Sequence, residues 1–466
     1  MSYQLCWLRT DLRMQDNSAL SQALECGPTL AIYIATPEQW QAHDDAPIKI
    51  DFWHRNLQEL EKQLQAMGIP LIFFQVPAYQ DIPALMTRIL KAWDIQCLHY
   101  NIEYPLNERK RDEAVTVVCE QGQVRVKAYE DQCLLPPDLV LTQADKPFKV
   151  FTPYANKCWE YLQTSGPVSS YGLTLSGSKQ KLESLKSLSD QRRLDALDWP
   201  EAQKSWEKLW PAGEKAAQKK LKDFVAKKIA DYQEDRNFPA QEGTSTLSPY
   251  LAAGVISVRQ CWEQAQAAGS NASVRSWCNE LLWRDFYKYV MHHYPHVCRH
   301  EAWNPNYAAI PWRQDEADFK RWCQGETGFP LIDAAMKQLL ETGWMHNRLR
   351  MLVAMFLSKN LLIDWRWGER WFMQHLVDGD FAANNGGWQW SASTGTDAAP
   401  YFRIFNPVRQ SERFDPQGEF IRHYISALKA ESSKSIHDPE KLKTDYPEPM
   451  VDLKFSRDRA LSAFRR

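Results

Sequence analysis

The chain has 466 residues, a formal net charge of −2 and 24% charged residues, an ordinary composition for a folded globular protein. This charge balance excludes a strongly basic nucleic-acid coat, so any DNA contact has to be a local patch. No apolar run approaches the roughly 18 residues of a membrane span, and charges occupy the start of the chain where a signal peptide is apolar. We therefore expect a cytoplasmic protein, with two or three domains at about 150 residues each.

The N-terminal part predicts an α/β domain over 1–132, because short apolar runs alternate with amphipathic segments as in a doubly wound parallel sheet. The predicted strands are 4–8, 30–35, 71–75, 97–101 and 124–128, and the predicted helices are 18–25, 48–67, 82–93 and 105–120. No G-x-G-x-x-G follows the first strand, where residues 7–13 are WLRTDLR. The usual dinucleotide fingerprint is therefore absent.

The periodicity weakens over 133–204, which contains Pro136 and Pro137 and a stretch rich in Ser, Lys and Leu. We expect a long interdomain connector here. From 205 to 466 nearly every segment has helical periodicity, so the second domain is expected to be mostly α-helical. Its predicted helices are 213–233, 274–292, 328–341, 344–359 and 368–377.

Cysteine and tryptophan are the two residue types whose number and spacing bear on function. The ten cysteines include no C-x-x-C, and the closest pair is Cys119 and Cys133, so we expect no zinc site, no other metal and no disulfide framework. The chain has 20 tryptophans, most of them after Trp199. Such enrichment indicates either a very aromatic core or a site built from stacking surfaces.

Two runs in the second domain carry polar groups suited to a ligand. The run 243–248 (GTSTLS) places hydroxyls ahead of an apolar segment, where they can bind a phosphate or simply cap a helix. In the next run, Trp277, Glu280 and Arg284 share one helix face. That face is either a buried pocket wall or an ordinary surface pair between Glu280 and Arg284.

Two later runs are also polar within apolar surroundings. The run 344–351 is expected to open a helix with Asn347 and Met351 one turn apart, which predicts either a lined cavity or a helix end with solvated arginines. The run 378–390 joins Asp378 and Asp380 to small and amide side chains, and we expect a loop that holds hydroxyls and a polar ring edge. A calcium loop is the alternative, but the D-x-D-x-D-G spacing and the late glutamate are missing.

Together these runs resemble the photolyase and cryptochrome flavoproteins, and most closely the bacterial class I cyclobutane pyrimidine dimer photolyases. The resemblance spans nearly the whole chain, is weakest near 164–204, and is most specific over 343–351 and 378–407 in series. It implies an α/β antenna domain, a connector, and a helical FAD-binding domain that holds one non-covalent FAD. The implied function is light-dependent DNA repair by a carbon–carbon lyase. An electron passes from excited reduced FAD to a cyclobutane pyrimidine dimer flipped out of DNA, and the dimer splits into two pyrimidines.

The resemblance also assigns roles to residues of this sequence. Asp378 and Asp380 would bind the sugar chain and ring edge, the hydroxyl run the diphosphate, and Asn384 would face the reactive flavin nitrogen. Position 246 is Thr where the family often has arginine, which puts one diphosphate contact in doubt. The FAD-binding residues implied are Tyr232, Thr244, Ser245, Leu247, Ser248, Trp277, Glu280, Arg284, Asn347, Arg350, Asp378, Asp380 and Asn384.

The substrate side and the light-driven steps involve further matches. Glu280 would act at the base edge, and Trp388, Trp365 and Trp312 match the family's tryptophan relay for reducing oxidised flavin, with core packing as the alternative for each. The residues implied to contact damaged DNA are Arg236, Trp283, Asn347, Arg348, Met351 and Trp390. The positions that bind an antenna folate, methenyltetrahydrofolate, in some relatives are His43, Asn107, Glu108 and Arg299, the last a lysine in a close relative.

Three functions compete at this stage: repair of cyclobutane dimers, repair of (6-4) photoproducts, and blue-light signalling without repair. In (6-4) enzymes, histidines stand at the positions of Asn347 and Met351, and neither residue here can donate a proton near neutral pH. A signalling cryptochrome usually loses parts of the repair pocket, whereas Glu280, Trp283 and Trp390 are present. The sequence therefore favours a monomeric cyclobutane dimer photolyase that binds damaged DNA and no membrane.

Overall fold

The computed structural model describes residues 2–167, 187–201, 206–442 and 444–465. Its contacts divide the chain into two compact units, each of which is described by itself. Unit 1 comprises 1–227, 245–270 and 278–295, and unit 2 comprises 228–244, 271–277 and 296–466. The domain limits 1–132, 133–204 and 205–466 stay a prediction. Within the described ranges, no helix is long and apolar enough to cross a membrane.

Unit 1 contains a six-stranded sheet in the order β5-β4-β1-β2-β3-β6. The first five strands are parallel and confirm the five predicted ones, while β6 runs antiparallel to β3. Because β6 has only two residues, no alternation in the sequence could reveal it. The strands are β1 (Tyr3–Leu8), β2 (Thr29–Ala35), β3 (Leu71–Gln75), β4 (Ile95–Asn101), β5 (Arg125–Tyr129) and β6 (Gln191–Arg192).

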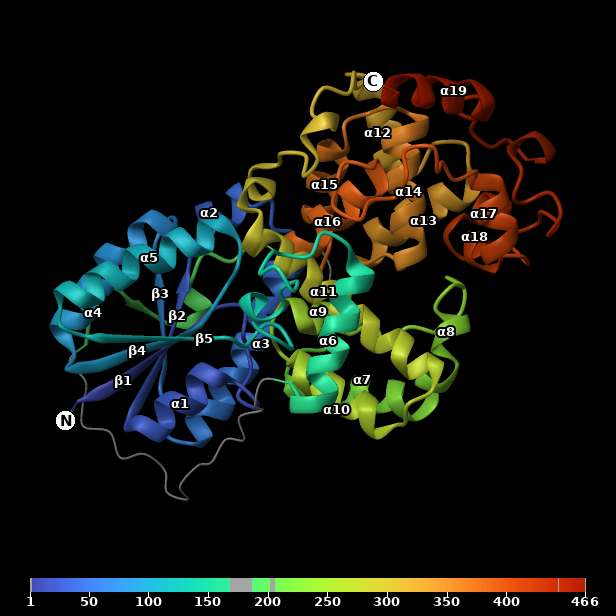
Figure 1. The fold of residues 1–466 in the computed structure, drawn as a ribbon. Helices are drawn as coiled ribbons and strands as arrows, with labels where there is room; N and C mark the ends of the chain where they lie inside the picture. The colour runs from blue at the N-terminus through green and yellow to red at the C-terminus, as the bar shows by residue number, and fades with distance from the viewer. Residues whose placement is uncertain (1, 168–186, 202–205, 443, 466) are drawn as a thin grey trace. The chain divides into compact units, whose positions relative to one another are not determined.

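Helices cover both faces of this sheet, with α1 and α3 on one face and α4 and α5 on the other (Figure 1). Strands β1 and β2 are buried along their whole length, as central strands between two helical layers should be. The doubly wound α/β fold and its four predicted helices are thus confirmed. The helices up to this point are α1 (Ser18–Cys26), α2 (Pro37–Ala42), α3 (Pro47–Ala66), α4 (Ile82–Ala92) and α5 (Leu106–Gln121).

The run 7–13, which stands where a dinucleotide fingerprint would be, serves buried ion pairs. Arg13 donates to Asp131, and Arg259 Nη2 donates to Asp131 Oδ1 at 2.7 Å. Burial alone would raise the pKa of Asp131, but the charges of Arg13 and Arg259 hold it well below its ordinary value. These pairs tie the end of β1 to residues far along the chain within unit 1.

The segment predicted as a connector contains a regular helix, α6 (Phe151–Ser165). It buries Tyr154, Cys158, Trp159 and Leu162 on one side, and the sequence interpretation missed this periodicity beside the irregular residues that flank it. Residues 168–186 and 202–204 of the predicted connector lie outside the described residues. Unit 1 also contains α7 (Glu214–Lys227), α9 (Ser248–Ala252) and α10 (Val258–Ala267).

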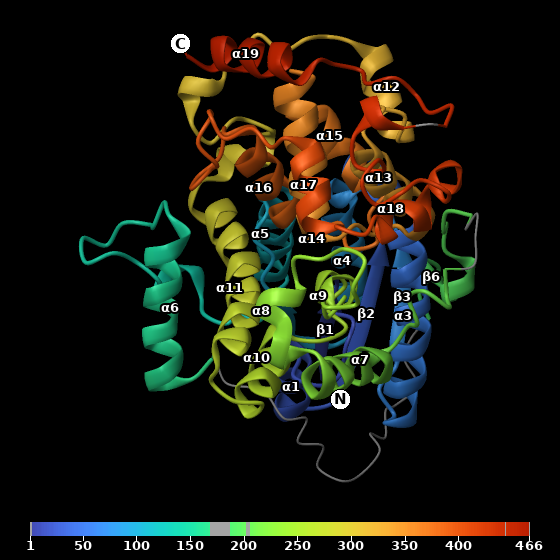
Figure 2. The same ribbon diagram turned by 90° about the vertical axis from the view of Figure 1, so that its right-hand side faces the viewer.

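Unit 2 is helical, with α13 and α14 packed together and α16, α17 and α18 against them (Figure 2). Its core is unusually aromatic and includes Trp322, Trp365, Phe372 and Trp388. The helices are α8 (Tyr232–Asp235), α12 (Glu316–Gln324), α13 (Pro330–Thr342), α14 (Asn347–Met355), α15 (Trp365–Met373), α16 (Phe381–Ala392), α17 (Pro407–Phe414), α18 (Glu419–Tyr424) and α19 (Leu453–Phe464). A further helix, α11 (Ala272–His293), begins in unit 2 and ends in unit 1.

Three predicted helices need correction. The run 213–233 is interrupted, since α7 ends at Lys227 and α8 begins at Tyr232. The run 344–359 becomes helical only at Asn347 and ends in a π-helical turn, Phe356–Asn360. The predicted helix 368–377 is shifted, since α15 begins earlier, at Trp365, and ends at Met373. It begins there because Asp364 is the N-cap and accepts from the Arg366 amide.

Candidate active site

The hydroxyl run is a short loop that leads into α9. The N-cap residue of α9 is Leu247, whose side chain cannot accept a hydrogen bond, so ordinary capping does not explain the hydroxyls. Ser245 Oγ accepts from the Leu247 amide at 3.4 Å. Thr246 has a φ of 48°, a left-handed conformation that is strained for a β-branched residue. Because such strain is typical of functional loops, it favours a binding role here.

A lysine accompanies this loop. Lys220 Nζ, on α7, donates to Thr246 Oγ1 at 2.7 Å. Position 246 is the one at which the sequence lacks the family's frequent arginine. A cation therefore stands beside the threonine, contributed by a different helix of unit 1.

The face of α11 that carries Trp277, Glu280 and Arg284 is partly buried. Trp277 is 3% exposed, and Glu280 and Arg284 are half-buried. Arg284 Nη1 donates to the Gln132 carbonyl at 2.5 Å and to Asp285 Oδ1 at 3.0 Å. Arg284 is thus held by two groups of unit 1. These contacts go beyond the simple surface pair with Glu280 that the sequence offered as the alternative.

Trp283 is partly used in packing. Its ring stacks on Phe151 with centroids 3.7 Å apart and an interplanar angle of 10°, and Phe286 lies edge-on at 5.8 Å. The indole remains half-buried, with one face taken by Phe151. Tyr287 also packs against it, tilted, with centroids 5.6 Å apart.

The start of α14 is set by a histidine. Gly343 ends α13 in a left-handed conformation, with a φ of 68°, and His346 Nδ1 then accepts from the Arg348 amide at 3.2 Å. Burial, together with the charges of Arg348, Arg350 and another arginine, lowers the pKa of His346 to about 3. The imidazole is consequently neutral at physiological pH.

A cluster of arginines lies around this helix start in unit 2. Arg348 donates to Asn237 and lies over the Phe414 ring, 4.4 Å from its centroid. Burial, with the charges of Arg236 and Arg413, lowers the pKa of Arg348. The three guanidinium groups repel one another, and a bound anion would relieve that repulsion. The cluster therefore favours an anionic ligand.

Helix α14 itself carries Asn347 and Met351, the first exposed and the second half-buried. Arg350 Nη2 donates to both carboxylate oxygens of Asp378, at 3.0 and 2.8 Å. This bifurcated contact from one guanidinium nitrogen holds a carboxylate that is 7% exposed. The arginines are therefore not simply solvated, and the sequence alternative of a plain helix end is wrong for Arg350.

The run 378–390, expected as a loop, is helical from Phe381 onward. Asp380 is the N-cap, and its Oδ1 accepts from the Ala383 amide at 3.0 Å. Asn384 Nδ2 donates to the Glu369 carbonyl at 2.9 Å, which directs its Oδ1 away from that carbonyl. One turn later, a Cβ atom added to Gly387 would meet no atom within 4 Å. Helix α16 therefore leaves open space at Gly387, one turn from the Asn384 amide, and such a surface fits a planar ring lying against it.

Glu369 and His300 support this amide and were not predicted. The Glu369 carboxylate, 1% exposed, accepts from Asn385 Nδ2 at 2.8 Å and lies 3.0 Å from His300 Nδ1. This hydrogen bond raises the pKa of His300, although burial opposes it. No local pattern links Glu369 to Asn385, since they lie on α15 and α16, so the sequence offered no signal.

The three relay candidates belong to one aromatic region of unit 2. Trp388 is 2% exposed, Trp365 is fully buried, and the half-buried Trp312 packs against the same core. The Trp388 ring lies so close to Gly368 that a Cβ there would come within 2.1 Å of it. Trp322 lies edge-on to Trp388 at 6.0 Å and was not singled out from the sequence.

The remaining candidates are distributed over both units. His43, Asn107 and Glu108 do come together in unit 1, with His43 Nε2 3.0 Å from Asn107 Nδ2 and His43 Nδ1 3.7 Å from Glu108 Oε1. Arg299 lies in unit 2. Tyr232 is buried beneath the Arg236 guanidinium. Further half-buried candidates are Thr244, Ser245, Ser248, Asp380 and Trp390.

Comparisons with known proteins agree with this arrangement. Residues 4–170 match the family described as DNA photolyase, and 277–466 match the FAD binding domain of DNA photolyase. The chain belongs to the DNA photolyase family. The matched FAD domain, and a donor set that fits a flavin, make it an FAD-binding protein.

Several relatives cover the whole chain. A Vibrio cholerae protein named deoxyribodipyrimidine photo-lyase is 42% identical over 99% of both chains. The Escherichia coli protein of that name is 41% identical over 100% of this chain and 98% of its own. Among solved structures, a class III photolyase from Agrobacterium tumefaciens has a TM-score of 0.85 at 33% identity, covering 100% and 97%. A Synechocystis cryptochrome has a TM-score of 0.87 at 29% identity, covering 99% of both chains.

Proposed function

We propose that this protein is a light-dependent DNA repair enzyme that splits cyclobutane pyrimidine dimers. The observation that carries the proposal is the arginine cluster of Arg236, Arg348 and Arg413 in the FAD-binding unit. In proteins that contact DNA, guanidinium groups of this kind bind the phosphates of the backbone. The cluster would therefore allow a protein of net charge −2 to bind DNA through a local patch. The full-length relatives named deoxyribodipyrimidine photo-lyase support the same substrate.

When bound, reduced FAD supplies the photoexcited electron of this chemistry. The protein's own residues hold it. In unit 2, Arg350 orients the Asp378 carboxylate for hydroxyl groups, and Asp380 caps α16. The Asn384 amide, fixed by the Glu369 carbonyl, turns its oxygen toward a ring nitrogen at the open face by Gly387. Glu369 thus acts as a positioning residue for Asn384.

We infer that Lys220 takes the place of the arginine that the family often has at position 246. Its ammonium group already donates to Thr246 Oγ1 in the hydroxyl loop, so it can also donate to a diphosphate bound there. Lysine is a point charge without the fork of arginine, so the contact is retained as charge and loses the bidentate geometry. The strained Thr246 backbone supports a ligand-binding role for the same loop.

Cyclobutane dimers fit the pocket residues better than (6-4) photoproducts do. The second reaction needs a proton donor near neutral pH, and neither Asn347 nor Met351 can supply one. The neighbouring His346 cannot replace them, because its pKa of about 3 leaves it neutral. For a cyclobutane dimer, the half-buried indoles of Trp283 and Trp390 would each offer a stacking surface to an unstacked base, and Glu280 would act at the base edge.

We also propose the relay and the antenna. Trp388, Trp365 and Trp312 would carry electrons to oxidised flavin, which their shared aromatic core supports. The group His43, Asn107 and Glu108 would bind methenyltetrahydrofolate, since its imidazole, amide and carboxyl groups suit a polar heterocycle. An archaeal photolyase from Sulfolobus tokodaii contains two FAD molecules, so a second flavin is the alternative antenna. Cytoplasmic location and the monomeric state stay predictions from the sequence.

The test is repair of defined lesions by the purified protein with its bound cofactors. Under blue light and reductant, an oligonucleotide with one thymine cyclobutane dimer should be restored, whereas one with a (6-4) photoproduct and a dark sample should not. A cryptochrome without repair activity would show light-dependent flavin changes and an intact dimer, and that result would refute the proposal. The absorption spectrum of the same sample identifies flavin and folate together.

A further inference from the structure

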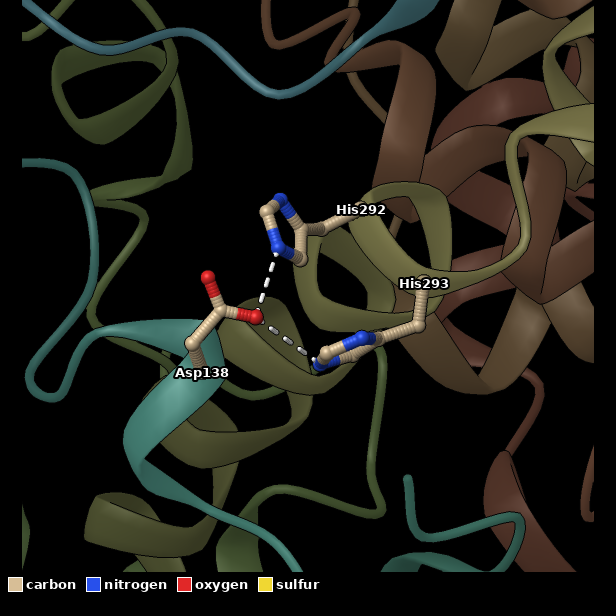
Figure 3. A group of neighbouring side chains, drawn as sticks. All are labelled: Asp138, His292 and His293. Carbon is tan, nitrogen blue, oxygen red and sulfur yellow. Dashed lines mark hydrogen bonds and ion pairs between the residues drawn. The ribbon is translucent and has the colours of Figure 1, made fainter. Parts of the chain in front are cut away.

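Three metal-binding side chains converge in unit 1, and none of them was assigned a role above. Asp138 lies on a single 3₁₀ turn, Pro137–Leu139, and His292 and His293 end α11. One donor atom from each side chain lies within 4.8 Å of the others. Figure 3 shows both imidazole rings directed at the same carboxylate.

The geometry points to a site for one divalent transition-metal ion, of which Zn²⁺ suits the donors best. Zn²⁺ binds histidine nitrogen and carboxylate oxygen at about 2.0–2.2 Å in a tetrahedron, which places its donors about 3.3 Å apart. Asp138 Oδ1 lies 2.9 Å from His292 Nε2 and 4.0 Å from His293 Nε2. These distances bracket the required value, so small side-chain rotations bring all three donors into range, and water completes the tetrahedron.

An ordinary ion pair explains only part of this group. The contact between Asp138 and His292 is such a pair, but His293 is a second imidazole directed at the same oxygen. His293 Nε2 also lies 3.4 Å from the Pro137 carbonyl. With a metal bound, each ring keeps its proton on Nδ1 and presents Nε2 as the ligand, which is the neutral form that metals bind.

The surroundings restrain the segments that carry the donors before any metal binds. The two histidines are 23% and 12% exposed, whereas Asp138 is 75% exposed, so a metal ion can enter from the carboxylate side. Tyr289 packs against the His293 ring at 4.4 Å and donates to the Val140 carbonyl at 2.9 Å. This hydrogen bond already joins the turn to α11. A metal at this point would act as a clamp between the same two segments.

The spacing along the chain explains why no sequence motif signals the site. Asp138 and His292 are 154 residues apart, so no short motif contains both of them. The expectation that no metal binds rested on cysteine spacing and on the run 378–390, and neither includes these residues. The inference is also independent of the proposed repair function, because none of the three side chains was assigned to FAD, DNA or the antenna.

Titration calorimetry with ZnCl₂ on the untagged, FAD-loaded protein tests the proposal. We expect one equivalent of Zn²⁺ per chain, and binding at least about tenfold weaker in each of Asp138→Asn, His292→Ala and His293→Ala. The control is His54→Ala, which removes a half-buried histidine of the same unit outside the group and should leave binding unchanged. Zn²⁺ should also raise the thermal midpoint of the parent and not that of His292→Ala.

A variant that fails to fold would show a lost flavin spectrum, so flavin content is measured for each. In that case Co²⁺ added to the parent protein gives a second test, since tetrahedral Co²⁺ absorbs strongly in the visible and Zn²⁺ should displace it. Binding that is equal in the parent and the three variants overturns the proposal. So does a parent protein that gives neither a Zn²⁺ isotherm nor a tetrahedral Co²⁺ spectrum.

Discussion

His346 should make the stability of the FAD-binding unit sensitive to mild acid. The neutral imidazole caps α14, the helix that carries Asn347, Arg348 and Arg350. Burial and the neighbouring arginines lower its pKa to about 3, against about 6.5 in the unfolded chain. Because the pKa of His346 is lower in the folded state, the contribution of the neutral imidazole to the free energy of unfolding is fully present above pH 6.5. It is lost progressively as the pH falls from 6.5 toward 3.

The magnitude follows from the two pKa values. A pH of 5 is about 1.5 units below the pKa of the unfolded imidazole, whereas the folded imidazole is still neutral at that pH. At 1.36 kcal/mol per unit, the free energy of unfolding therefore falls by about 2 kcal/mol. The test variant is His346→Asn, because asparagine is among the best N-cap residues and does not titrate. The variant should therefore keep the cap and lose the pH dependence.

The assay is urea unfolding of the parent and His346→Asn from pH 7.5 to 4.5, monitored by tryptophan fluorescence and flavin release. The difference in unfolding free energy between the two proteins should change by about 2 kcal/mol between pH 7.5 and pH 5, in favour of the variant at the lower pH. The control, His423→Asn, replaces an exposed histidine of the same unit and should show no such trend. A difference between parent and His346→Asn that stays constant over this range would refute the argument.

Four further results are expected. Trp283→Ala should weaken binding to thymine-dimer DNA by about 1–3 kcal/mol in fluorescence anisotropy with FAD retained, whereas Trp283→Phe should keep most of it, and equal affinities would remove Trp283 from the substrate site. Arg348→Gln should make the slope of log affinity against log salt less negative by about 0.9, and an unchanged slope would mean that Arg348 touches no phosphate. Trp388→Phe should block photoreduction of oxidised flavin while chemically reduced enzyme still repairs, and bleaching at the parental rate would exclude Trp388 from the relay. Lys220→Met should weaken FAD binding by about 1.5 kcal/mol, measured by equilibrium dialysis, with recovery on adding Thr246→Arg, and unchanged binding would show that Lys220 makes no diphosphate contact.

Local patterns were enough to predict the sheet and most helices. The strands β1 to β5 are short apolar runs separated by amphipathic segments, and that alternation has one common solution, a doubly wound sheet. The errors lie where tertiary contacts outweigh local propensity. Residues 381–392 contain two asparagines and two glycines, which are poor helix formers, yet the Asp380 cap and packing on α15 make them helical.

The site could be predicted only as far as the family motifs reach. Motif matching named Asn384 and Thr246, but not the groups that orient them, Glu369 and Lys220. Lys220 lies on a different helix from the loop that it contacts, and its spacing from Thr246 follows no helix or strand period. Supporting residues of this kind are fixed by the fold, so they become visible only when the chain is folded.

The tryptophans show how core packing and function can coincide. Gly368 leaves room for the Trp388 ring, and Phe372 and Trp322 hold it edge-on at 5.1 and 6.0 Å, so this indole is as tightly packed as any core residue. Its Nε1 is buried and has no hydrogen-bond partner among the described residues.

An indole that loses an electron becomes a strong acid, and without an acceptor its proton stays in place. The positive charge then remains free to move to the next ring, whereas loss of the proton would trap the radical on Trp388. Trp312, which is half-buried, is the member of the proposed relay where the proton can reach solvent and end the transfer. In the proposed relay, burial of Trp388 would keep the charge mobile, so the same packing that suggests a structural role would also suit electron transfer.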